Sequence, residues 1–457
     1  MFYKLGRVIA RGKTKRVLQT DQRGVVVLEN LPSITAFDDS SVTKEFDTKA
    51  VAATTTTCRV FELLKAAGIP VAFIEQVSST SFAAMGCGML PYEAVARRYA
   101  VGSYLKRHPE MAETAPPYRF RCLVTELFLK TTKGKVVLTD GQEHDLSLDP
   151  ENGEEDPLLV KEDGRWILYH AKKPGWVVGA RLGTLALGDL PCEHLEEIDN
   201  LLRRVFMVLE AAWAQLGWRF IDLKIEFGID IDGNLAVADV IDNDSWRLRD
   251  INWKEMSKQV FRDQISAGAV DLDEVAWLYD TVAMMTSQFR IPEQAIVLWL
   301  GSRSDEEQVV KAVNDQRTIR MPAGVSLVEV IGSGHRETAK VLGMLSLIER
   351  QFTGGVVIID LVGLSNGLGP ILSAHTSCPV ISVPLTPEDA PSSLRLPGKV
   401  PASTMLGVSN ALHQAVQILG LNNPAAYAAA RMLAETDMGL PTCATFSDIA
   451  MVMAVQE

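Results

Sequence analysis

The chain has 457 residues, of which 47% are hydrophobic and 22% charged, and its formal net charge at pH 7 is −12. This composition is typical of a soluble globular protein, and the length allows two or three domains. Such an acidic balance excludes a general affinity for nucleic acid or for anionic membranes, because both need a basic face. A local cluster of Lys and Arg could still hold a small anionic ligand.

The six cysteines are scattered, and no two of them form a CxxC pair. The sequence therefore indicates neither a zinc site nor a disulfide framework. The opening stretch, MFYKLGRVIARGKTKR, lacks the apolar segment of a secretory signal, and no apolar run reaches membrane-spanning length. We expect a cytoplasmic enzyme with reduced cysteines.

Short alternating segments open the chain, and GRVIARGKTKRVLQT and GVVVLEN predict antiparallel strands. The stretch KAVAATTTTCRVFELLKAAG predicts a helix. Residues 131 to about 190 are polar and rich in Gly and Pro, which indicates an inserted region of hairpins and loops. A long amphipathic helix is predicted by CEHLEEIDNLLRRVFMVLEAAWAQLG, where apolar residues recur at helical spacing before a glycine.

The pattern changes in the second part of the chain. From Ala295 onward, apolar strands such as AIVLWL, VSLVEVI and GVVIID alternate with helices, which predicts a parallel sheet covered on both faces. The expected division follows from this change: a first domain at 1–265 with an insertion at about 131–155, a helical connector at 266–294, and a second domain at 295–457.

A basic turn, RGKTK, lies between the first two expected strands. Five residues separate Gly6 from Gly12, one more than in a P-loop, and the flanks alternate as strands do. Two interpretations stay open. The turn is either a solvated run of charge, or a hairpin turn that lays its N–H groups and Lys13 or Lys15 over the phosphates of a nucleotide.

An acidic hairpin is predicted by FIDLKIEFGIDIDGNLAVADVID, because the Asp-Gly pair at 232–233 is a preferred two-residue turn. With that turn, Glu226 faces Asp239, and facing carboxylates repel each other unless a cation lies between them. Mg²⁺ takes one or two protein carboxylates together with phosphate oxygens. The hairpin therefore predicts a Mg-ATP site with Lys224 on the same face, and a solvent-exposed acidic hairpin is the alternative.

Three strand ends in the second domain carry candidate binding loops. GSRSD at 301–305 offers N–H groups and hydroxyls to an anion, although Ser and Asp are also ordinary helix caps. GSGHRET adds His335 and Arg336, a candidate acid/base pair, with a structural histidine as the alternative. The third stretch, LVGLSNGLGPILSAHTSCPVISVP at 361–384, contains no charged residue.

The segments RGKTKRV, ITAFD, ARRYAVGSYLKR, DLKIEFG and ADVIDNDSWRL, in this order over residues 1 to about 265, resemble the SAICAR synthetase (phosphoribosylaminoimidazole-succinocarboxamide synthetase) family. The resemblance implies an ATP-grasp-like cleft in which ATP activates the carboxylate of CAIR, a phosphoribosyl aminoimidazole carboxylate. The nitrogen of L-aspartate then attacks, giving the amide SAICAR, ADP and phosphate. It assigns ATP to Lys13, Lys15, Lys224, Glu226 and Asp239, Mg²⁺ to Glu226 and Asp239, and substrate to Asp38, Lys49, Arg97, Ser103, Asp156 and Arg247.

One segment of this part has a second interpretation, and another departs from the family pattern. Taken by itself, RRYAVGSYLKR has the pattern of a basic amphipathic helix, and many such stretches are only solvated faces. The family usually has an acidic D–DP stretch soon after LFxK, whereas here EEDP at 154–157 follows the LFLK that ends at Lys130 only after the insertion.

The three loops of the second domain, together with SSLRLP at 392–397, resemble phosphoribosylaminoimidazole (AIR) carboxylase in the animal form, which uses CO₂ directly and is fused behind the synthetase. The resemblance covers about 295–420 and implies a flavodoxin-like three-layer domain, a homo-octamer and conversion of AIR to CAIR. A neutral pocket suits CO₂, because a fixed charge would attract water and bicarbonate. It assigns catalysis to His335, Arg336, Ser365, Asn366 and Gly367, and substrate to Gly301, Ser302, Ser304, Asp305, Ser333 and Gly369.

This second half departs from the family at the reacting end. Related animal enzymes read GRSNGLGP and SAHKGP, where this chain has Leu364 in place of the arginine and reads SGHRET. Two alternatives to a bifunctional enzyme therefore stay open. One is a synthetase whose second domain is a non-catalytic oligomerisation scaffold, and the other is a nucleotide-binding relative without enzymatic activity. The partners expected are small-molecule substrates, with neither nucleic acid nor membrane.

Overall fold

The computed structural model describes residues 3–36, 42–46, 48–111, 115–131, 135–137, 143–145, 156–162, 165–172, 194–302 and 320–437. The chain forms two compact units, one of residues 1–289 with 435–457 and the other of residues 290–434. Asp38, Ser304 and Asp305 lie outside the described residues, as does most of the expected insertion. Within the described ranges, no helix is long and apolar enough to cross a bilayer.

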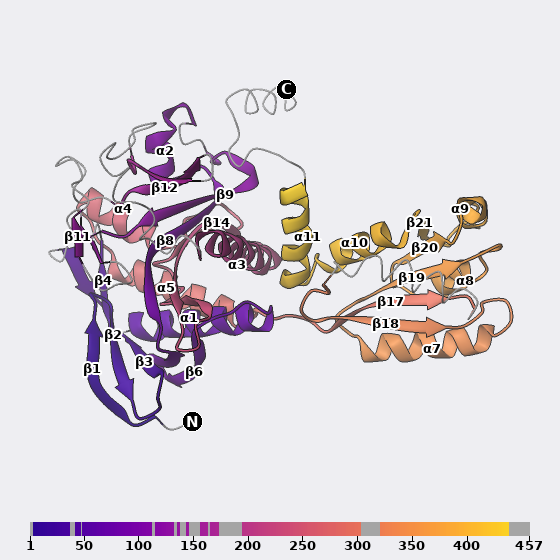
Figure 1. Ribbon diagram of the computed structural model, residues 1–457, viewed down its shortest axis with the longest axis horizontal. Helices are drawn as coiled ribbons and strands as arrows, with labels where there is room; N and C mark the ends of the chain where they lie inside the picture. Colours follow the sequence, from indigo (N-terminus) through magenta and orange to yellow (C-terminus); the bar gives the residue numbers. More distant parts are fainter. Residues whose placement is uncertain are drawn as a thin grey trace. The chain divides into compact units, whose positions relative to one another are not determined.

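The first unit begins with an antiparallel sheet in the strand order β1-β2-β3-β7-β6 (Figure 1). Its strands are β1 (Leu5–Arg11), β2 (Lys15–Thr20), β3 (Val25–Asn30), β7 (Ser81–Met85) and β6 (Phe73–Ser78). Helix α1 (Lys49–Ala66) packs on this sheet, and its Phe61 ring stacks on Phe73 with centroids 5.8 Å apart. The hairpin and the helix predicted from the sequence are both present.

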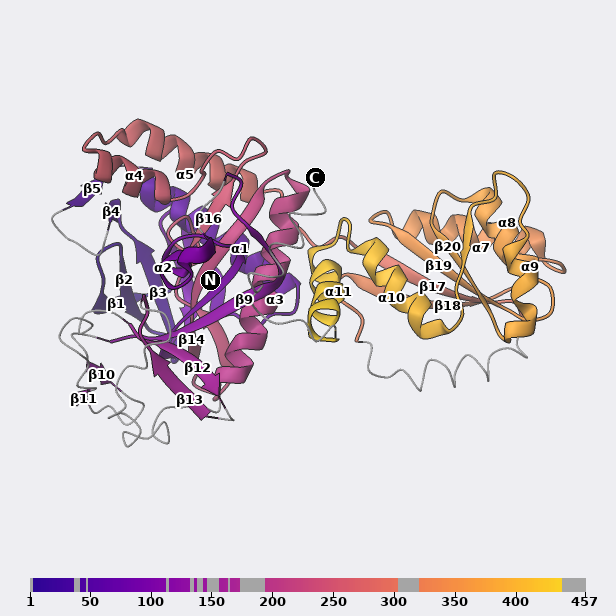
Figure 2. The same cartoon turned by 90° about the horizontal axis from the view of Figure 1, so that it is seen from above.

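A larger antiparallel sheet carries the residues of the acidic hairpin. Its order is β13-β12-β9-β8-β14-β15, and a further strand, β16, pairs with β14. The strands are β13 (Arg165–Tyr169), β12 (Leu158–Glu162), β9 (Arg119–Leu129), β8 (Gly88–Tyr99), β14 (Arg219–Ile229), β15 (Leu235–Ala238) and β16 (Trp246–Arg249). Figure 2 shows α3 (Leu195–Gln215) lying along this sheet, where Phe206 packs on Phe220.

Shorter elements complete the described part of the first unit. Helix α5 (Leu272–Thr286) packs against α1, so this part of the expected connector lies inside the first unit. The other elements are β4 (Ser33–Thr35), β5 (Thr43–Glu45), α2 (Ser103–Arg107), η2 (Pro109–Met111), β10 (Lys135–Val137), β11 (Glu143–Asp145) and α4 (Gln259–Ala267).

The second unit is a parallel sheet with the strand order β18-β17-β19-β20-β21, which is the 2-1-3-4-5 order of flavodoxin-like folds. The strands are β17 (Gln294–Leu300), β18 (Val325–Ile331), β19 (Val356–Val362), β20 (Val380–Pro384) and β21 (Ala402–Thr404). The flavodoxin-like domain predicted from the sequence is confirmed.

Helices cover both faces of this sheet (Figure 1). On one face, α7 (Thr338–Gln351) and α8 (Leu368–His375) bury Val297, Trp299 and Ile358. On the other face, α10 (Val408–Leu419) packs on Leu298 and Ile359. The remaining elements are η5 (Pro387–Asp389), α9 (Ala390–Leu394) and α11 (Pro424–Asp437). Apolar residues thus alternate between two cores, which is the pattern the strand sequences predicted.

Candidate functional sites

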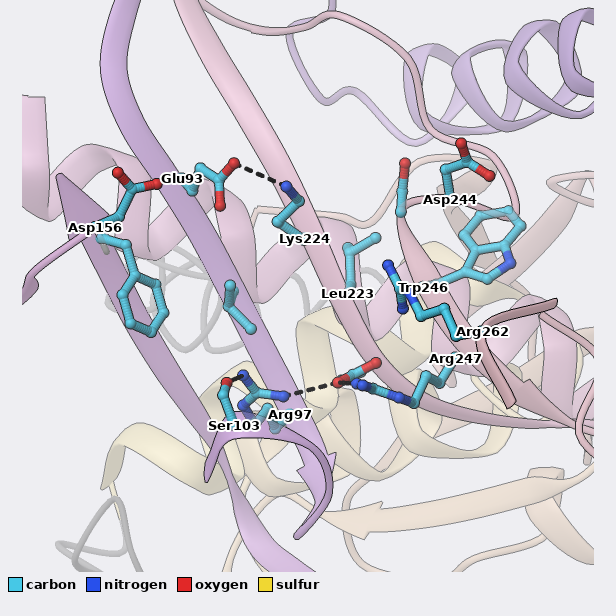
Figure 3. Close-up of a pocket in the computed structure, with 14 residues that line it drawn as sticks. Glu93, Arg97, Ser103, Asp156, Leu223, Lys224, Asp244, Trp246, Arg247 and Arg262 are labelled. Atoms are coloured by element: carbon cyan, nitrogen blue, oxygen red, sulfur yellow. Dashed lines mark hydrogen bonds and ion pairs between the residues drawn. The ribbon is translucent and has the colours of Figure 1, made fainter. Parts of the chain in front are cut away.

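A cavity of about 290 Å³ opens on the larger sheet of the first unit. Five residues expected in the synthetase site line it together: Arg97, Ser103, Asp156, Lys224 and Arg247 (Figure 3). The figure shows the arginines at one end of the cavity, with Lys224 and Asp156 at the other. Five further labelled residues line it that the sequence analysis did not single out: Glu93, Leu223, Asp244, Trp246 and Arg262.

Arg97 is held rigidly at the arginine end. It lies in β8 and is 4% exposed, so RRYA is a strand and the expectation of a basic amphipathic helix was wrong at this point. Its Nε donates to Glu126 at 2.6 Å, its Nη1 to Asp222 at 2.7 Å and its Nη2 to Ser103 at 3.1 Å. Burial lowers the pKa of Arg97, and Asp222 opposes that effect.

The two carboxylates that bind Arg97 also bind two further arginines, which gives a row of alternating charges. Glu126 also accepts from Arg107, and Asp222 also accepts from Arg247. Three guanidinium groups therefore share two carboxylates, which leaves one positive charge over in this row. A partly exposed arginine in such a row is suited to binding a phosphate or a carboxylate with two parallel hydrogen bonds.

The sheet register explains why these groups meet. Asp222 on the central strand β14 is paired with Arg97 on β8 and with Arg247 on β16. Directly paired residues of antiparallel strands lie on one face of the sheet. Asp222 stands two residues before Lys224, so the alternation in DLKIEFG was a signal that could have identified it.

The acidic hairpin forms, but its register differs from the predicted one. Glu226 is paired with Ala238, one residue before Asp239, and on its other side it faces Glu93. The turn has three residues because Asp230 N–H donates to the Asn234 carbonyl. The facing carboxylates are thus Glu93 and Glu226, and the prediction that Glu226 faces Asp239 was wrong.

Lysines neutralise the acidic end of the cleft. Lys224 contacts Glu93 at 2.8 Å, Lys130 contacts Glu226 at 2.8 Å, and Lys15 forms an ion pair with Asp239. Burial lowers the pKa of Lys130, but Glu226, Glu93 and Asp239 together raise it above its ordinary value. Asp239 therefore lies near Glu226 without being its strand partner, since its positive φ of 64° ends the strand alternation.

Lys13 and Lys15 belong to the turn between β1 and β2, where Gly12 N–H donates to the Lys15 carbonyl. This is the hairpin turn expected of RGKTK. The ion pair between Lys15 and Asp239 connects it to the acidic hairpin. Asp156 accepts a hydrogen bond from Thr131 N–H at 2.6 Å, and burial raises the pKa of its carboxyl. Of the residues expected around ATP, Lys224 lines the cleft, Glu226 and Asp239 lie near Lys130, and Lys15 is paired with Asp239.

Lys49 lies at the start of α1, where it is 1% exposed and acts on the buried Asp242 and the partly buried Asp244. Burial and the neighbouring Asp244 raise the pKa of Asp242 to about 6. Burial would also raise the pKa of Asp244, but Lys49 and Lys258 lower it below its ordinary value. Asp244 stays ionised on the cavity wall because Lys258, at 2.8 Å, and Lys49 compensate its charge.

In the second unit, the expected site residues lie at the carboxyl ends of three neighbouring parallel strands. Gly301 and Ser302 follow β17, Ser333 to Arg336 follow β18, and Ser365 to Gly369 follow β19. This edge is where open α/β sheets bind ligands.

Two of these loops touch each other. A Cβ at Gly334 would lie 2.8 Å from the Leu368 Cα, and any side chain at Gly367 would collide with the His335 ring. The His335 imidazole therefore lies directly against the backbone of the Ser-Asn-Gly loop. Glycines are needed here because the two loops approach so closely.

Asn366 organises the loop beneath its exposed neighbours. Its Nδ2 donates to Ser382 at 3.0 Å and to Ser393 at 2.9 Å, and its Oδ1 accepts from Gly369 N–H at 2.9 Å. Ser365 is exposed, and so is Leu364, which takes the place of the family's arginine with 91% exposure and a positive φ of 53°. Asn366 thus shapes the loop, and SSLRLP supplies two of its partners, Ser392 and Ser393.

Comparisons with known proteins also divide the chain into two parts. The model of the SAICAR synthetase family matches residues 8–141 and 182–276, and that of the AIR carboxylase family matches residues 295–438. The bifunctional phosphoribosylaminoimidazole carboxylase/phosphoribosylaminoimidazole succinocarboxamide synthetase of Drosophila melanogaster is 33% identical, over 92% of this chain and 90% of its own. The protein of that name from Homo sapiens is 31% identical, over 92% and 91%.

A shorter relative matches the first part of the chain. The phosphoribosylaminoimidazole-succinocarboxamide synthase of Roseiflexus castenholzii is 32% identical over 285 residues, which are 62% of this chain and 97% of its own. A protein that consists almost entirely of the synthetase part thus exists by itself.

Proposed function

The chain belongs to the family of bifunctional enzymes that join SAICAR synthetase to AIR carboxylase, and we propose that it catalyses both steps. The second domain converts AIR and CO₂ to CAIR, releasing a proton. The first domain condenses CAIR with L-aspartate at the expense of ATP and gives SAICAR, ADP and phosphate. The observation that carries this proposal is the match to bifunctional relatives over nine-tenths of both lengths.

In the synthetase domain, the arginine end of the cavity holds CAIR. Arg247, oriented by Asp222, binds the phosphate or carboxylate of CAIR together with Ser103, and Arg262 completes that wall. Arg97 fixes Asp222 and Ser103 in place, since most of its donors are already bound to the protein. Asp38, Lys49 and Asp156 are assigned to the same cleft on the resemblance.

ATP binds at the opposite, acidic end. Lys13 and Lys15 reach its phosphates from the hairpin turn, and Lys224 acts beside them. Glu226 and Asp239 offer carboxylate oxygens, the donors that Mg²⁺ prefers, and phosphate oxygens complete such a set. Bound Mg²⁺ would neutralise phosphate charge.

The chemistry needs positioning and positive charge from the protein. The carboxylate oxygen of CAIR attacks the γ-phosphorus, ADP leaves, and an acyl phosphate results. The amine of L-aspartate attacks the acyl carbon, phosphate leaves, and the amide nitrogen loses a proton. Lys224 and the arginines line one open cavity, where they can act on the same substrates.

In the carboxylase domain, the nucleophile is a carbon of AIR, so the protein needs no nucleophile of its own. The loop with Ser365, Asn366, Gly367 and Gly369 offers a neutral site for CO₂, because it carries no charged side chain and its glycines let substrate approach the backbone. His335 with Arg336 moves the proton that the carbon releases. The first and second loops, with Gly301, Ser302, Ser304, Asp305 and Ser333, hold the substrate phosphate.

We further propose that the protein is a cytoplasmic homo-octamer that assembles through the second domain. The octamer rests on the resemblance of this domain to the animal carboxylases. The four cysteines within the described ranges form no disulfide bond, which suits a reducing compartment: Cys58, Cys87, Cys122 and Cys378.

The test measures each half reaction on the purified full-length chain. Carboxylation of AIR is followed in bicarbonate buffer at neutral pH without ATP, and amide formation is followed with supplied CAIR, ATP, Mg²⁺ and L-aspartate. We expect enzyme-dependent product in both assays. Amide formation without carboxylation would leave a synthetase on an oligomerisation scaffold, and absence of both would overturn the proposal.

A further inference from the structure

Asp360 is an acidic residue inside an otherwise apolar strand. It lies in β19, VVIIDLV, and is 0% exposed. Strand alternation places it with Ile358 and Val362 on the face that α7 and α8 cover. It stands three residues before Gly363, where the loop of the proposed carboxylase site begins.

Its carboxylate is bonded to neutral groups. Ser382 on β20, its partner in the sheet register, donates to Oδ1 at 2.9 Å. Within the described part of the chain, Asp360 forms no ion pair, and its Oδ2 accepts no hydrogen bond. A buried carboxylate without a cation is costly, which makes Asp360 a candidate for a role beyond packing.

A continuous set of hydrogen bonds connects Asp360 to the loop above it. Ser382 Oγ donates to Asp360 and accepts from Asn366 Nδ2 at 3.0 Å. Asn366 Oδ1 in turn accepts from Gly369 N–H at 2.9 Å. A Cβ at Gly369 would lie 2.5 Å from Ser382 Oγ and 2.7 Å from Asp360 Oδ2, so the first turn of α8 rests directly on this network.

We propose that Asp360 is a positioning residue for carboxylation: through Ser382 and Asn366 it fixes the loop from Ser365 to Gly369 that lines the CO₂ pocket. The inference rests on the carboxylase function proposed above. Without the acceptor at position 360, the Ser382 hydroxyl turns away, the Asn366 amide loses one partner and the loop loses its fixed orientation.

The protonation state of Asp360 adds a pH dependence to this role. Burial raises the pKa of the carboxyl to about 7, against the lowering effect of the hydrogen bond from Ser382 and of the nearby Asn366 amide. Ionised Asp360 puts a negative charge beneath a pocket in which a second carboxylate forms during the reaction. We therefore expect carboxylation to slow as the pH rises through 7.

The surroundings offer this charge little compensation. Trp299 faces Asp360 from β17, Ser382 faces it from β20, and the loop adds Asn366; none of these side chains titrates. Of the titratable groups nearby, His375 at the end of α8 bonds its own helix at Ile371, and Asp389 before α9 accepts from Thr386. His335, from the loop after β18, contacts the backbone of Gly367.

The experiment compares Asp360→Ala, Asp360→Asn and Ser382→Ala with a matched control, Ser373→Ala. Ser373 is also a buried serine of this domain, but its hydroxyl has no partner within the described residues. ATP-independent carboxylation is measured from pH 5.5 to 8.5 as kcat and KM for AIR. Amide formation by the same chains serves as the check on folding.

We expect Asp360→Ala and Ser382→Ala to lower kcat about tenfold or more with little change in KM, because small displacements of aligned groups are costly. Asp360→Asn keeps a neutral acceptor and should flatten the fall of activity around pH 7. The control should match the unaltered protein. Wild-type kcat and an unchanged pH profile in Asp360→Ala would overturn the proposal.

A second readout separates this inference from the carboxylase function itself. Amide hydrogen exchange of the segment 365–369 is measured on the same variants without substrate. Faster exchange in Asp360→Ala than in Ser373→Ala supports the positioning role even if the unaltered chain does not carboxylate AIR. Equal exchange in the two would reject it, whatever the activity.

Discussion

Arg97 on β8 and Asp222 on β14 face each other in the sheet register, and the guanidinium Nη1 donates to the carboxylate Oδ2 at 2.7 Å. Both side chains are almost completely buried. The same carboxylate accepts from Arg247, so a single acidic residue orients the two arginines that the sequence placed in the substrate site.

The variant Asp222→Asn tests this relationship. It keeps the shape of the side chain but removes the charge that both arginines share, and hydrogen bonds to charged groups contribute about 1.5–3 kcal/mol. We expect kcat/KM of amide formation with CAIR to fall about 30-fold, which corresponds to about 2 kcal/mol. Steady-state kinetics with varied CAIR measures the change.

The control for that variant is Asp280→Asn, which removes an exposed carboxylate from α5 in the same unit. It should leave the synthetase reaction unchanged, and ATP-independent carboxylation should be unchanged in both variants. Normal CAIR kinetics in Asp222→Asn would mean that the arginines are oriented by something other than the shared carboxylate.

The residues of β14 that face the cavity could be predicted from the sequence, whereas their partners on other strands could not. Strand alternation in DLKIEFG puts alternate residues on one face, and that face is the cavity wall. The partner strands could not be derived in the same way, because Arg97 reaches Asp222 across 125 residues of chain. Glu126 and Arg262 were missed because their role depends on such long-range pairing.

The error in the hairpin register has a local cause. An Asp-Gly pair is compatible with a two-residue turn, but Asp230 Oδ1 accepts from the N–H groups of Asp232 and Asn234. These bonds favour the three-residue loop that contains Gly233 at positive φ. A shift of one residue then places Ala238, and not Asp239, opposite Glu226. Asp239 still lies near Glu226 because the strand alternation ends there, and it forms an ion pair with Lys15.

In the second domain, the fold was easier to predict than the buried side chains beneath its loops, such as Asp360. A parallel sheet places every βα loop at one edge, so three apolar strands with polar loops were enough to predict that the three loops lie together there. Asp360 was overlooked because a strand pattern does not reveal whether a single acidic residue is buried with a partner or marks a strand end.

Asp239→Asn tests the acidic end of the cleft. The variant removes the charge that pairs with Lys15, and we propose that the same carboxylate holds Mg²⁺ when ATP is bound. We expect amide formation to fall about a hundredfold, because charge neutralisation at a transferring phosphoryl group is a large catalytic effect. Carboxylation without ATP should be unaffected.

Asp232→Asn is the matched control, since it lies in the exposed turn of the same hairpin. Titration of Mg²⁺ at fixed ATP should show a raised requirement for the metal in Asp239→Asn and an unchanged one in the control. Equal Mg²⁺ dependence in both would exclude Asp239 from the metal site.

Lys49→Met tests the charge balance around Asp242 and Asp244. Removing one partner of a buried set of charges destabilises proteins by about 3–5 kcal/mol, and Lys49 is 1% exposed. We expect faster hydrogen exchange throughout α1 and reduced amide formation. Lys65→Met, at the exposed end of the same helix, should change neither. Unaltered exchange in Lys49→Met would show that Lys258 alone compensates the two aspartates.

The pH dependence of stability in the second unit provides the last prediction. Burial raises the pKa of Asp360 from its ordinary 3.8 to about 7. Between these two values the unfolded chain loses a proton that the folded chain keeps, so the free energy of unfolding decreases as the pH rises from about 4 to about 7. The full effect is about 4 kcal/mol.

The amide of Asp360→Asn does not titrate. Between pH 4 and 7 we therefore expect its free energy of unfolding to stay constant at this site, whereas that of the unaltered chain decreases. Hydrogen exchange of the β19 amides measures the free energy of opening of this unit alone. The two proteins should differ little near pH 4, and the variant should be the more protected one at pH 7 and above. Parallel curves for the two would mean that Asp360 is ionised in the fold at ordinary pH, and that Ser382 and Asn366 compensate its charge by hydrogen bonding.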